Sequence, residues 1–444
     1  MKVKALPHNP GPAAWNAILP KQDSLPSLSA QETADWLVIG AGFAGLSAAR
    51  RLQIEAPNDR IIILEAKGLA EGPAGRNSGF MIDLPHDLTS DDYGGQIDKD
   101  RITIAQNRLA IDFARDMVET LHLPSEAFRE VGKINAAASE KGLKHNSEYA
   151  AHLNNLGEPH SVLDAQEMQE ITGISYYQGG LFTPGAVMLQ PALYIRSLGA
   201  KLLSNRLRIY ERSPVVALER KDGLWQAKTP EGSIRAPKVI LAVNGHVENF
   251  GLFSRQLVHV FTYASMTRAL SSMDCAKLGG HPDWGLTPAD PLGTTVRRIS
   301  GDGGDRIIVR NRFTYEPSMM PSARVQQSAY KTHIQSFTAR FPMLKSVAME
   351  YQWGGHLTLS LNNVAAFGEV EDGLFSACCQ NGLGTVKGTL HGLAAADLAM
   401  GRDNDLIRQL QSAPAPKHLP PEPIATLGAA LRLGWGELRA GKEL

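Results

Sequence analysis

The sequence predicts an α/β protein, and three observations support this fold class. Short apolar runs, DWLVIG at 35–40 and RIIILE at 60–65, are separated by a run of helix formers, as in parallel strands joined by helices. Glycines stand where the first apolar run meets the helix pattern. Farther along, TTVRRIS and RIIVRNRFTY flank GDGGD, which indicates an antiparallel hairpin. We therefore expect a parallel sheet and an antiparallel sheet in one chain.

Length and charge exclude several classes of protein. The chain has 444 residues, so we expect more than one structural unit, since a typical domain has about 150. Lysine plus arginine number 45, as do aspartate plus glutamate, which gives a formal net charge of zero. Proteins that bind nucleic acid or a membrane through basic clusters need excess positive charge, so we expect neither kind of partner.

Cysteine usage and hydropathy predict the compartment. The three cysteines, Cys275, Cys378 and Cys379, form neither a disulfide framework nor a C-x-x-C pair. The amino terminus has no apolar signal core, and no window approaches about 18 continuous apolar residues. We expect a cytoplasmic protein without a transmembrane segment.

The chain opens with an arm and a βαβ unit. Residues 1–32 are rich in proline and polar residues and show no period, so they predict an arm rather than a domain. Strand 35–40 is followed by the turn GAGFAG, the helix LSAARRLQIE and strand 60–65. These elements form one unit of about 30 residues.

The middle of the chain predicts helices first and then strands. We expect helices over 99–120, 139–156 and 191–204. Ile102, Leu109, Phe113 and Val118 lie near one face of the first, which predicts its buried side. Strands VVALER, LWQAKT and KVILAV follow, and then the hairpin.

The last part returns to helices. Residues 323–341 predict a helix stopped by Pro342, and 375–400 predict a strand, a glycine turn and a long helix. In the tail, Leu427, Leu431 and Trp435 form an amphipathic stripe, expected to pack on its own or a neighbouring subunit. Contact with a membrane is the alternative.

The first chemical signal is the glycine turn. Gly40, Gly42 and Gly45 form G-x-G-x-x-G between strand and helix, where a pyrophosphate can approach the backbone and the helix amino terminus. Glu65 ends the second strand 20 residues after Gly45, where an acid binds a ribose 2′-hydroxyl. The pattern predicts a Rossmann-like dinucleotide site and disfavours a 2′-phosphate.

Three further segments predict close backbone approach to the same ligand. GPAGRNSGF at 72–80 follows the second strand, and PKVILAVNGH at 237–246 ends a buried strand in Asn-Gly. NGLGT at 381–385 precedes the last helix, whose free amides would favour negative charge nearby.

This combination of motifs, in this order, resembles the FAD-dependent amine and amino-acid oxidoreductases of the D-amino-acid oxidase family. The matching segments include VIGAGFAGLSAARRL, GRNSG, LFTPGAVMLQPALYIRSL, VILAVNGH, YQWGGHLTLSLNNVAAFG and NGLGTVKGT, over roughly residues 33–402. The proline-rich arm is most similar to the branch that includes γ-glutamylputrescine oxidase.

The resemblance implies two interleaved domains. A Rossmann-like FAD-binding domain of the glutathione-reductase type would comprise 33–85, 184–250 and 350–405. An α+β substrate domain built on an antiparallel sheet would comprise 86–183 and 251–349. The arm, 1–32, and a helical tail, 406–444, would flank them.

The resemblance also implies cofactor-binding residues. They are Gly40, Gly42, Phe43, Ala44, Gly45, Glu65, Ala66, Gly75, Arg76, Asn77, Ser78, Gly79, Val215, Ala242, Asn244, Gly245, Gly382, Leu383, Gly384 and Thr385.

Two departures from the family pattern bear on the cofactor and the electron acceptor. Some relatives attach the flavin through a cysteine in the stretch that here reads YQWGGHLTLS, which has none, so we expect non-covalent FAD. Some relatives activate oxygen with a lysine on a strand that here reads RIIVRNRF, which lacks lysine. The acceptor is therefore either O₂ or a carrier such as a quinone.

The expected reaction passes a hydride from the carbon beside an amine nitrogen to the flavin, and the imine then hydrolyses. We assign no catalytic residue. Substrate candidates are Tyr263, Trp353, His356 and, for a substrate carboxylate, Arg310. A lone histidine such as His356 is more often a structural hydrogen-bonding residue than a substrate contact.

Arginines at 297, 298, 306, 310 and 312 cluster on the hairpin, and we expect most of them on a solvated strand face. The acidic and histidine residues near 90 match no metal motif, so we expect a loop there and no metal.

Two other functions remain open. One is an FAD dehydrogenase of a hydroxy acid or amine that passes electrons to a quinone or protein carrier. The other is a non-catalytic flavoprotein subunit of a larger complex. The partners expected are a small amine or amino acid, an electron acceptor and, for the assembled enzyme, a second copy of the chain in a homodimer.

Overall fold

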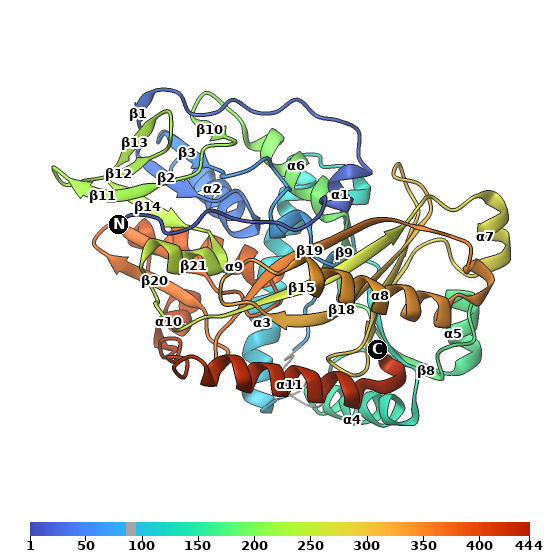
Figure 1. Cartoon of the computed structure of the whole chain (residues 1–444). Coiled ribbons are helices and arrows are strands. Elements are labelled where there is room, and N and C mark those ends of the chain that lie inside the picture. The colour runs from blue at the N-terminus through green and yellow to red at the C-terminus, as the bar shows by residue number, and fades with distance from the viewer. Residues whose placement is uncertain (86–94) are drawn as a thin grey trace.

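The computed structural model describes residues 1–85 and 95–444 and confirms the α/β class (Figure 1). Its parallel sheet has the strand order β10-β3-β2-β14-β21-β20. The strands are β10 (Leu207–Tyr210), β3 (Ile61–Leu64), β2 (Trp36–Ile39), β14 (Lys238–Leu241), β21 (Leu374–Cys378) and β20 (Ala366–Glu371). All neighbours are parallel except β20, which runs antiparallel to β21.

The apolar runs of this sheet are buried because both faces are covered. Along β2, Trp36 and Val38 belong to one core, while Leu37 and Ile39 belong to another. The first core holds residues of α2 (Phe43–Glu55), α3 (Ile97–Thr120), α6 (Pro191–Leu202) and α9 (Val386–Ala399). A strand buried on both faces reads as a continuous apolar run, as observed.

A smaller sheet covers the second face. Its strand order is β1-β13-β12-β11, and its residues Leu218, Trp225 and Ile234 lie in the same core as Leu37. The strands are β1 (Gln31–Thr33), β13 (Ser233–Ala236), β12 (Leu224–Lys228) and β11 (Ala217–Lys221). A three-stranded sheet, β4 (Phe80–Met81), β9 (Val187–Leu189) and β5 (Phe128–Arg129), lies elsewhere in the fold.

The expected antiparallel sheet is present and has eight strands in the order β19-β15-β18-β17-β16-β6-β8-β7. Its strands are β19 (Met349–Leu359), β15 (Val258–Thr267), β18 (Arg306–Tyr315), β17 (Thr295–Ile299), β16 (Trp284–Pro288), β6 (Lys133–Ala137), β8 (Gly179–Thr183) and β7 (Ser161–Leu163). Only the β16–β6 pairing is parallel among the described strands of this sheet.

Helices pack on this sheet from several segments of the chain. They include α4 (Glu140–Leu156), α5 (Ala165–Thr172), α8 (Ala323–Arg340) and α11 (Ile424–Ala440). Both α8 and α11 contact β18. Short elements include α1 (Ala14–Ala17), α7 (Ser272–Leu278), α10 (Asp405–Ser412), η1 (Pro73–Gly75) and η3 (Asn244–Phe250).

The face predicted for the helix at 99–120 is correct in part. Phe113 and Val118 are partly buried and pack against the core, but Ile102 and Leu109 are 46% and 43% exposed. The fully buried side of the helix carries Ala110, Ala114 and Met117. These three residues join the core that covers β2. The small alanines are on the packed side because α3 lies against α9, so hydrophobic size misled the assignment.

The stripe predicted on the tail helix does not pack on its own chain, and packing on a neighbouring subunit stays a prediction. Leu427, Leu431 and Trp435 are 60%, 74% and 66% exposed. The opposite, alanine-rich side of α11 lies against the molecule, and Glu437 pairs with Arg312 of β18 at 2.6 Å. Among the described helices, none is long and apolar enough to cross a bilayer.

Candidate cofactor and substrate site

A large cavity lies where the carboxyl ends of the parallel strands meet the eight-stranded sheet. Its empty volume is about 1800 Å³, counting space open to solvent. Its lining runs from the glycine turn and Glu65, on the parallel sheet, to Trp353 and His356 of β19. The cavity therefore joins the two large sheets.

The glycine turn lies at one end of this cavity. Gly40 has φ +103°, and a Cβ on Gly45 would stand 1.8 Å from the Gly40 carbonyl oxygen. A Cβ on Gly42 would meet nothing closer than Ala74, at 3.5 Å, so the second glycine leaves open space. The amino terminus of α2 carries no side-chain cap within the described residues. Its amides are available to a phosphate.

The Glu65 carboxylate lies beside this turn. Its Oε2 accepts the Ala41 amide and its Oε1 accepts the Lys67 amide, both at 2.9 Å. Burial raises the pKa of Glu65, and the two amides oppose that shift. These bonds fix the carboxylate on the cavity wall, where it can also accept a ribose hydroxyl.

Most of the predicted cofactor residues line the cavity. The lining includes Gly40, Gly42, Phe43, Ala44, Glu65, Ala66, Arg76, Asn77, Ser78, Val215, Ala242, Asn244, Gly382 and Gly384. The remaining predicted residues do not line it: Gly45, Gly75, Gly79, Gly245, Leu383 and Thr385.

Those behind the wall have packing roles. Thr385 donates from Oγ1 to the Phe80 carbonyl at 2.6 Å, and Leu383 is buried. A Cβ on Gly75 would lie 2.0 Å from the Ala70 carbonyl oxygen. A Cβ on Gly79 would lie 2.2 Å from Nη1 of Arg297. These glycines permit close backbone packing that supports the wall.

A second helix, α9, begins at the cavity and is held against α2. Its amino terminus has no side-chain cap in the described structure, and Gly384 before it has no atom within 4 Å of a built Cβ. A Cβ on Gly392 would lie 2.0 Å from the Ala44 carbonyl oxygen, so the two helices are in close contact. Both helix amino termini therefore face the same cavity.

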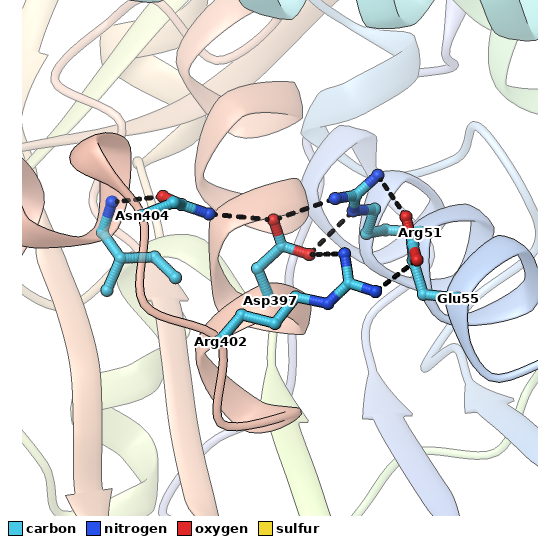
Figure 2. Close-up of polar contacts among 6 residues, drawn as sticks. Arg51, Glu55, Asp397, Arg402 and Asn404 are labelled. Carbon is cyan, nitrogen blue, oxygen red and sulfur yellow. Dashed lines mark hydrogen bonds and ion pairs between the residues drawn. The ribbon is translucent and has the colours of Figure 1, made fainter.

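An ion-pair network joins the far ends of these helices (Figure 2). Asp397 of α9 accepts two hydrogen bonds from Arg51 of α2, at 2.7 and 3.2 Å. Arg402 pairs with Asp397 at 3.7 Å and contacts Glu55. Asn404 donates to Asp397 at 3.3 Å. The network fixes α9 on α2.

Arg76 is held by backbone carbonyls rather than by a carboxylate. Its guanidinium donates to Pro10 and Gly354 at 3.0 and 3.2 Å, to Gly11 at 2.8 Å and to Glu71 at 2.6 Å. Burial lowers its pKa to about 10, so it stays charged at neutral pH. Arg76 therefore ties the amino-terminal arm to β19.

That arm is the main feature of the site that the sequence did not reveal. Five of its residues line the cavity: Val3, Ala5, Leu6, Pro7 and Asn9. The Val3 amide donates to Val216 at 2.9 Å, and the Lys4 amide donates to Asn249 at 3.0 Å. An aperiodic, proline-rich segment carries no sequence signal for such contacts.

The predicted substrate residues come together on the eight-stranded sheet. Tyr263, Arg310, Trp353 and His356 all line the cavity. Trp353 donates from its indole to the Arg76 carbonyl at 3.0 Å, and the Tyr263 hydroxyl bonds Thr314 at 2.8 Å. Arg310 lies over the Phe313 ring, 4.5 Å from its centroid.

The prediction that most hairpin arginines lie on a solvated face is wrong. Arg297, Arg298 and Arg306 are buried. Arg297, for example, donates to the carbonyls of Ser78, Gly79 and Leu189 at 3.1, 3.2 and 2.7 Å. Loops fold over this hairpin, and their carbonyls replace water around the guanidinium groups. Of the five, Arg310 lines the cavity.

Metal-ligand geometry is not found in the described residues, where no group of three or more histidine, cysteine, aspartate or glutamate side chains could hold an ion. The loop expected near residue 90, at 86–94, lies outside the described residues.

The arrangement fits a dinucleotide cofactor. It supplies the uncapped amino terminus of α2 for a pyrophosphate, a fixed carboxylate for a ribose and glycines that let the backbone approach. The uncapped amino terminus of α9 would favour negative charge on a cofactor ring. FAD would bring a pyrophosphate, a ribose and a redox-active ring together.

Comparisons with known proteins agree with this assignment. The family model described as "FAD dependent oxidoreductase" (DAO) matches residues 35–398. The chain is 26% identical over 392 residues to the probable oxidoreductase OrdL of Haemophilus influenzae, covering 86% of each chain. It is 23% identical over 390 residues to γ-glutamylputrescine oxidoreductase of Escherichia coli, covering 84% of this chain and 85% of that protein.

The fold has solved counterparts. The crystal structure of glycine oxidase from Geobacillus kaustophilus matches with a TM-score of 0.69 at 18% identity, over 84% of this chain and 96% of that chain. This likeness shows a shared fold. Together with the family match over residues 35–398, it shows that the chain belongs to the DAO family of FAD-dependent oxidoreductases.

Proposed function

We propose that this FAD-dependent oxidoreductase oxidises the C–N bond of a primary or secondary amine that carries a carboxylate. The observation that carries the proposal is Arg310, a cation on the wall of the same cavity as Glu65 and the glycine turn. A guanidinium binds a carboxylate through two parallel hydrogen bonds. The relatives named for γ-glutamylputrescine and glycine support this substrate class.

The residues of the chain have distinct roles in this scheme. Gly40, Gly42 and Glu65 would hold the ADP half of FAD, and Gly382 and Gly384 would lie near its ring. When bound, FAD supplies the redox chemistry by accepting a hydride from the carbon beside the nitrogen. Arg310 would orient the substrate, while Trp353 and Tyr263 would form an aromatic wall that also excludes water.

Anaerobic bleaching of the flavin tests the proposal. The purified holoprotein is mixed, without oxygen, with a panel of amines, amino acids, γ-glutamyl amines and hydroxy acids, and its visible absorbance is recorded. We expect carboxylate-bearing amines to bleach the flavin and matched hydroxy acids to leave it oxidised. Bleaching by hydroxy acids alone would contradict the proposal.

The electron acceptor distinguishes an oxidase from the alternative, a dehydrogenase. Lysine is absent from β18, which favours a carrier such as a quinone over O₂. Admitting air to the bleached protein decides between them: rapid recovery of colour with peroxide indicates an oxidase, and slow recovery that a quinone accelerates indicates a dehydrogenase. A flavin that no substrate in the panel reduces would instead support the non-catalytic subunit.

Four expectations remain as parts of the proposal. Non-covalent attachment predicts that acid precipitation leaves all FAD in the supernatant. The homodimer predicts twice the chain mass in light scattering, and the cytoplasm remains the expected compartment. The division into FAD and substrate domains also stays a prediction, and β19, which it assigns to the FAD domain, pairs with β15 of the substrate domain.

A further inference from the structure

Three histidines and a glutamate form a cluster between η3, β15 and β19, in which His259 and His356 are buried. They are His246 and Glu248 of η3, His259 of β15 and His356 of β19. His356 and His259 stack with ring centroids 5.3 Å apart, and His246 meets His356 edge to face at 5.4 Å. His246 and His356 line the cofactor cavity. The cluster therefore begins at the cavity wall.

Within the cluster, three side chains form a continuous hydrogen-bonded chain. His356 Nε2 lies 3.1 Å from His259 Nδ1, and His259 Nε2 lies 2.6 Å from Glu248 Oε2. His259 is buried, whereas the Glu248 side chain is 18% exposed. The chain thus runs from the cavity wall to a carboxylate that reaches solvent.

Donor and acceptor roles along this chain follow from the carboxylate. An ionised Glu248 can only accept, so His259 carries its proton on Nε2 and offers Nδ1 as an acceptor. His356 must then donate from Nε2, which leaves its Nδ1 as an acceptor. Burial lowers the pKa of His356 well below its usual value, so a neutral ring is expected. A proton added at one end reverses all these roles together.

The cavity end of the chain lacks protein partners. His356 Nδ1, Thr358 Oγ1 and Asn244 Oδ1 are buried and make no hydrogen bond among the described residues. All three residues line the cavity. Gly245 allows this arrangement, since a Cβ there would stand 2.1 Å from Thr358 Oγ1 and 2.7 Å from His356 Cε1. Buried polar atoms without partners indicate a ligand that supplies them.

We propose that Glu248, His259 and His356 form a proton relay that carries one proton from the cofactor cavity to the outside of the chain. The inference rests on the proposed function, since an amine that enters as an ammonium must lose one proton before it can donate a hydride. His356 is the residue at the cavity, and His259 and Glu248 are positioning residues that act through it.

The step balances in protons and electrons. An N–H bond of the substrate ammonium breaks, and its proton joins Nδ1 of His356. The Nε2 proton of His356 passes to Nδ1 of His259, and the Nε2 proton of His259 passes to Oε2 of Glu248. The neutral amine could then give up its C–H hydrogen with both bonding electrons, and bound FAD would supply the hydride acceptor. Glu248 gives up its proton to water.

Other titratable groups lie beside the cluster. His246 of η3 is hydrogen-bonded through Nδ1 to the Asn249 amide at 3.1 Å, and burial lowers its pKa to about 4. Tyr315 of β18 lies within the electrostatic reach of Glu248. The Glu316 amide donates to the His259 carbonyl, and His418 contacts Gln256, whose amide donates to Glu248. None of these groups extends the chain from His356 to Glu248.

Nuclear magnetic resonance of the holoprotein, without substrate, tests the hydrogen-bonded chain independently of activity. Ring ¹⁵N shifts of His356 and His259 are compared in the wild type and in Glu248→Gln. We expect the wild type to hold His356 as the Nε2–H tautomer, and Glu248→Gln to shift both rings toward a mixture. Unchanged tautomers in the variant would overturn the relay.

Anaerobic stopped-flow measurement of flavin reduction tests proton transfer along the relay in the holoprotein. The substrate is an amine that bleaches the wild-type flavin. We expect Glu248→Gln and His259→Asn to slow flavin reduction about 10²-fold and to remove its dependence on pH between about 6 and 9. Glu248→Asp should restore part of the rate. His333→Asn, which changes a buried histidine outside the cavity, should keep the wild-type pH profile and FAD content.

The outcomes separate the relay from the function on which it rests. If no amine reduces the wild-type flavin, the proposed function fails, and the relay of a substrate proton fails with it. If amines reduce the wild type and the two variants with the same rate and pH profile, the relay alone is overturned.

Discussion

Individual residues on the cavity wall are fixed by backbone contacts rather than by paired charges. Glu65 accepts two amides, Arg76 donates to four carbonyls, and Trp353 donates to the Arg76 carbonyl. A side chain bound to backbone keeps its place when the ligand enters or leaves. The wall is therefore largely preformed, as is usual for cofactor sites.

Gly45→Ala tests the contact between α2 and the glycine turn. The new Cβ would lie 1.8 Å from the Gly40 carbonyl oxygen, so the helix must move away from β2. We expect a loss of about 3 kcal/mol in the free energy of unfolding and of most bound FAD. Urea unfolding and the visible spectrum measure both.

A matched control is Gly428→Ala in α11, where a Cβ meets nothing within 4 Å. The free energy of unfolding of this variant should rise by up to about 1 kcal/mol, and its FAD content should not change. Equal FAD content in Gly45→Ala and the wild type would refute the role given to this turn.

Arg310→Gln tests recognition of a substrate carboxylate. Loss of a charged hydrogen-bonding pair costs about 1.5–3 kcal/mol, so kcat/KM for a carboxylate-bearing amine should fall about 10- to 100-fold. The same variant should leave kcat/KM for the corresponding amine without a carboxylate nearly unchanged. Equal losses for both substrates would show that Arg310 has a structural role instead.

At the scale of elements, two attachments decide the shape of the cofactor site. One joins the amino-terminal arm to β19, through the Gly354 amide that donates to the Pro10 carbonyl at 2.9 Å. The other joins α2 to α9 through Asp397 and close helix contact. Each links segments that are far apart in sequence.

Gly11→Val should release the arm. Gly11 has φ +72°, and a Cβ there would stand 2.3 Å from the Gln352 carbonyl oxygen, so valine fits neither the backbone nor the space. We expect faster release of FAD on dilution, followed by flavin fluorescence. The control Gly157→Val carries a similar φ of +77° but faces open space. It should lower stability without changing FAD release, and identical release from both variants would contradict a role for the arm.

Asp397→Asn should loosen α9 from α2. Asp397 is 2% exposed and accepts charged hydrogen bonds from Arg51 (Figure 2). We expect a loss of about 1.5–3 kcal/mol in the free energy of unfolding, measured by urea titration. Asp405→Asn is a suitable control, because its side chain is 86% exposed and its pair with Arg408 should contribute little. Equal stability of Asp397→Asn and the wild type would refute the network's role.

At the scale of the whole molecule, buried histidines predict an acid limit to stability. Burial lowers the pKa of His333 and of His391 to about 3 each, against about 6.5 in an unfolded chain. As pH falls below about 6.5, the unfolded state binds protons that the folded state does not, so stability is lost progressively toward pH 3. Above about pH 7 these groups have no effect.

Urea unfolding at several pH values measures this loss. We expect the free energy of unfolding to fall steadily from about pH 7 to about pH 5, and to fall less steeply in His333→Asn. A free energy that stays constant over that range would contradict the prediction.

Features that depend on short segments of the chain could be predicted from the sequence. The glycine turn, Glu65 and the two apolar runs lie within about 30 residues, and local geometry brings them together without help from the rest of the chain. The order of the motifs likewise indicated the family and the cofactor. The hairpin and the helix boundaries followed from turn residues and from proline.

Tertiary structure alone decided the remainder, because those features need contacts between distant segments. Whether an arginine of the hairpin is buried depends on loops that cover it, and the buried side of α3 depends on α9. The arm lines the cavity because its Pro10 carbonyl bonds β19. His259 of β15 bonds Glu248 of η3 and His356 of β19 because folding brings these three segments together. Periodicity measures which residues could be buried, whereas packing against a partner decides which ones are.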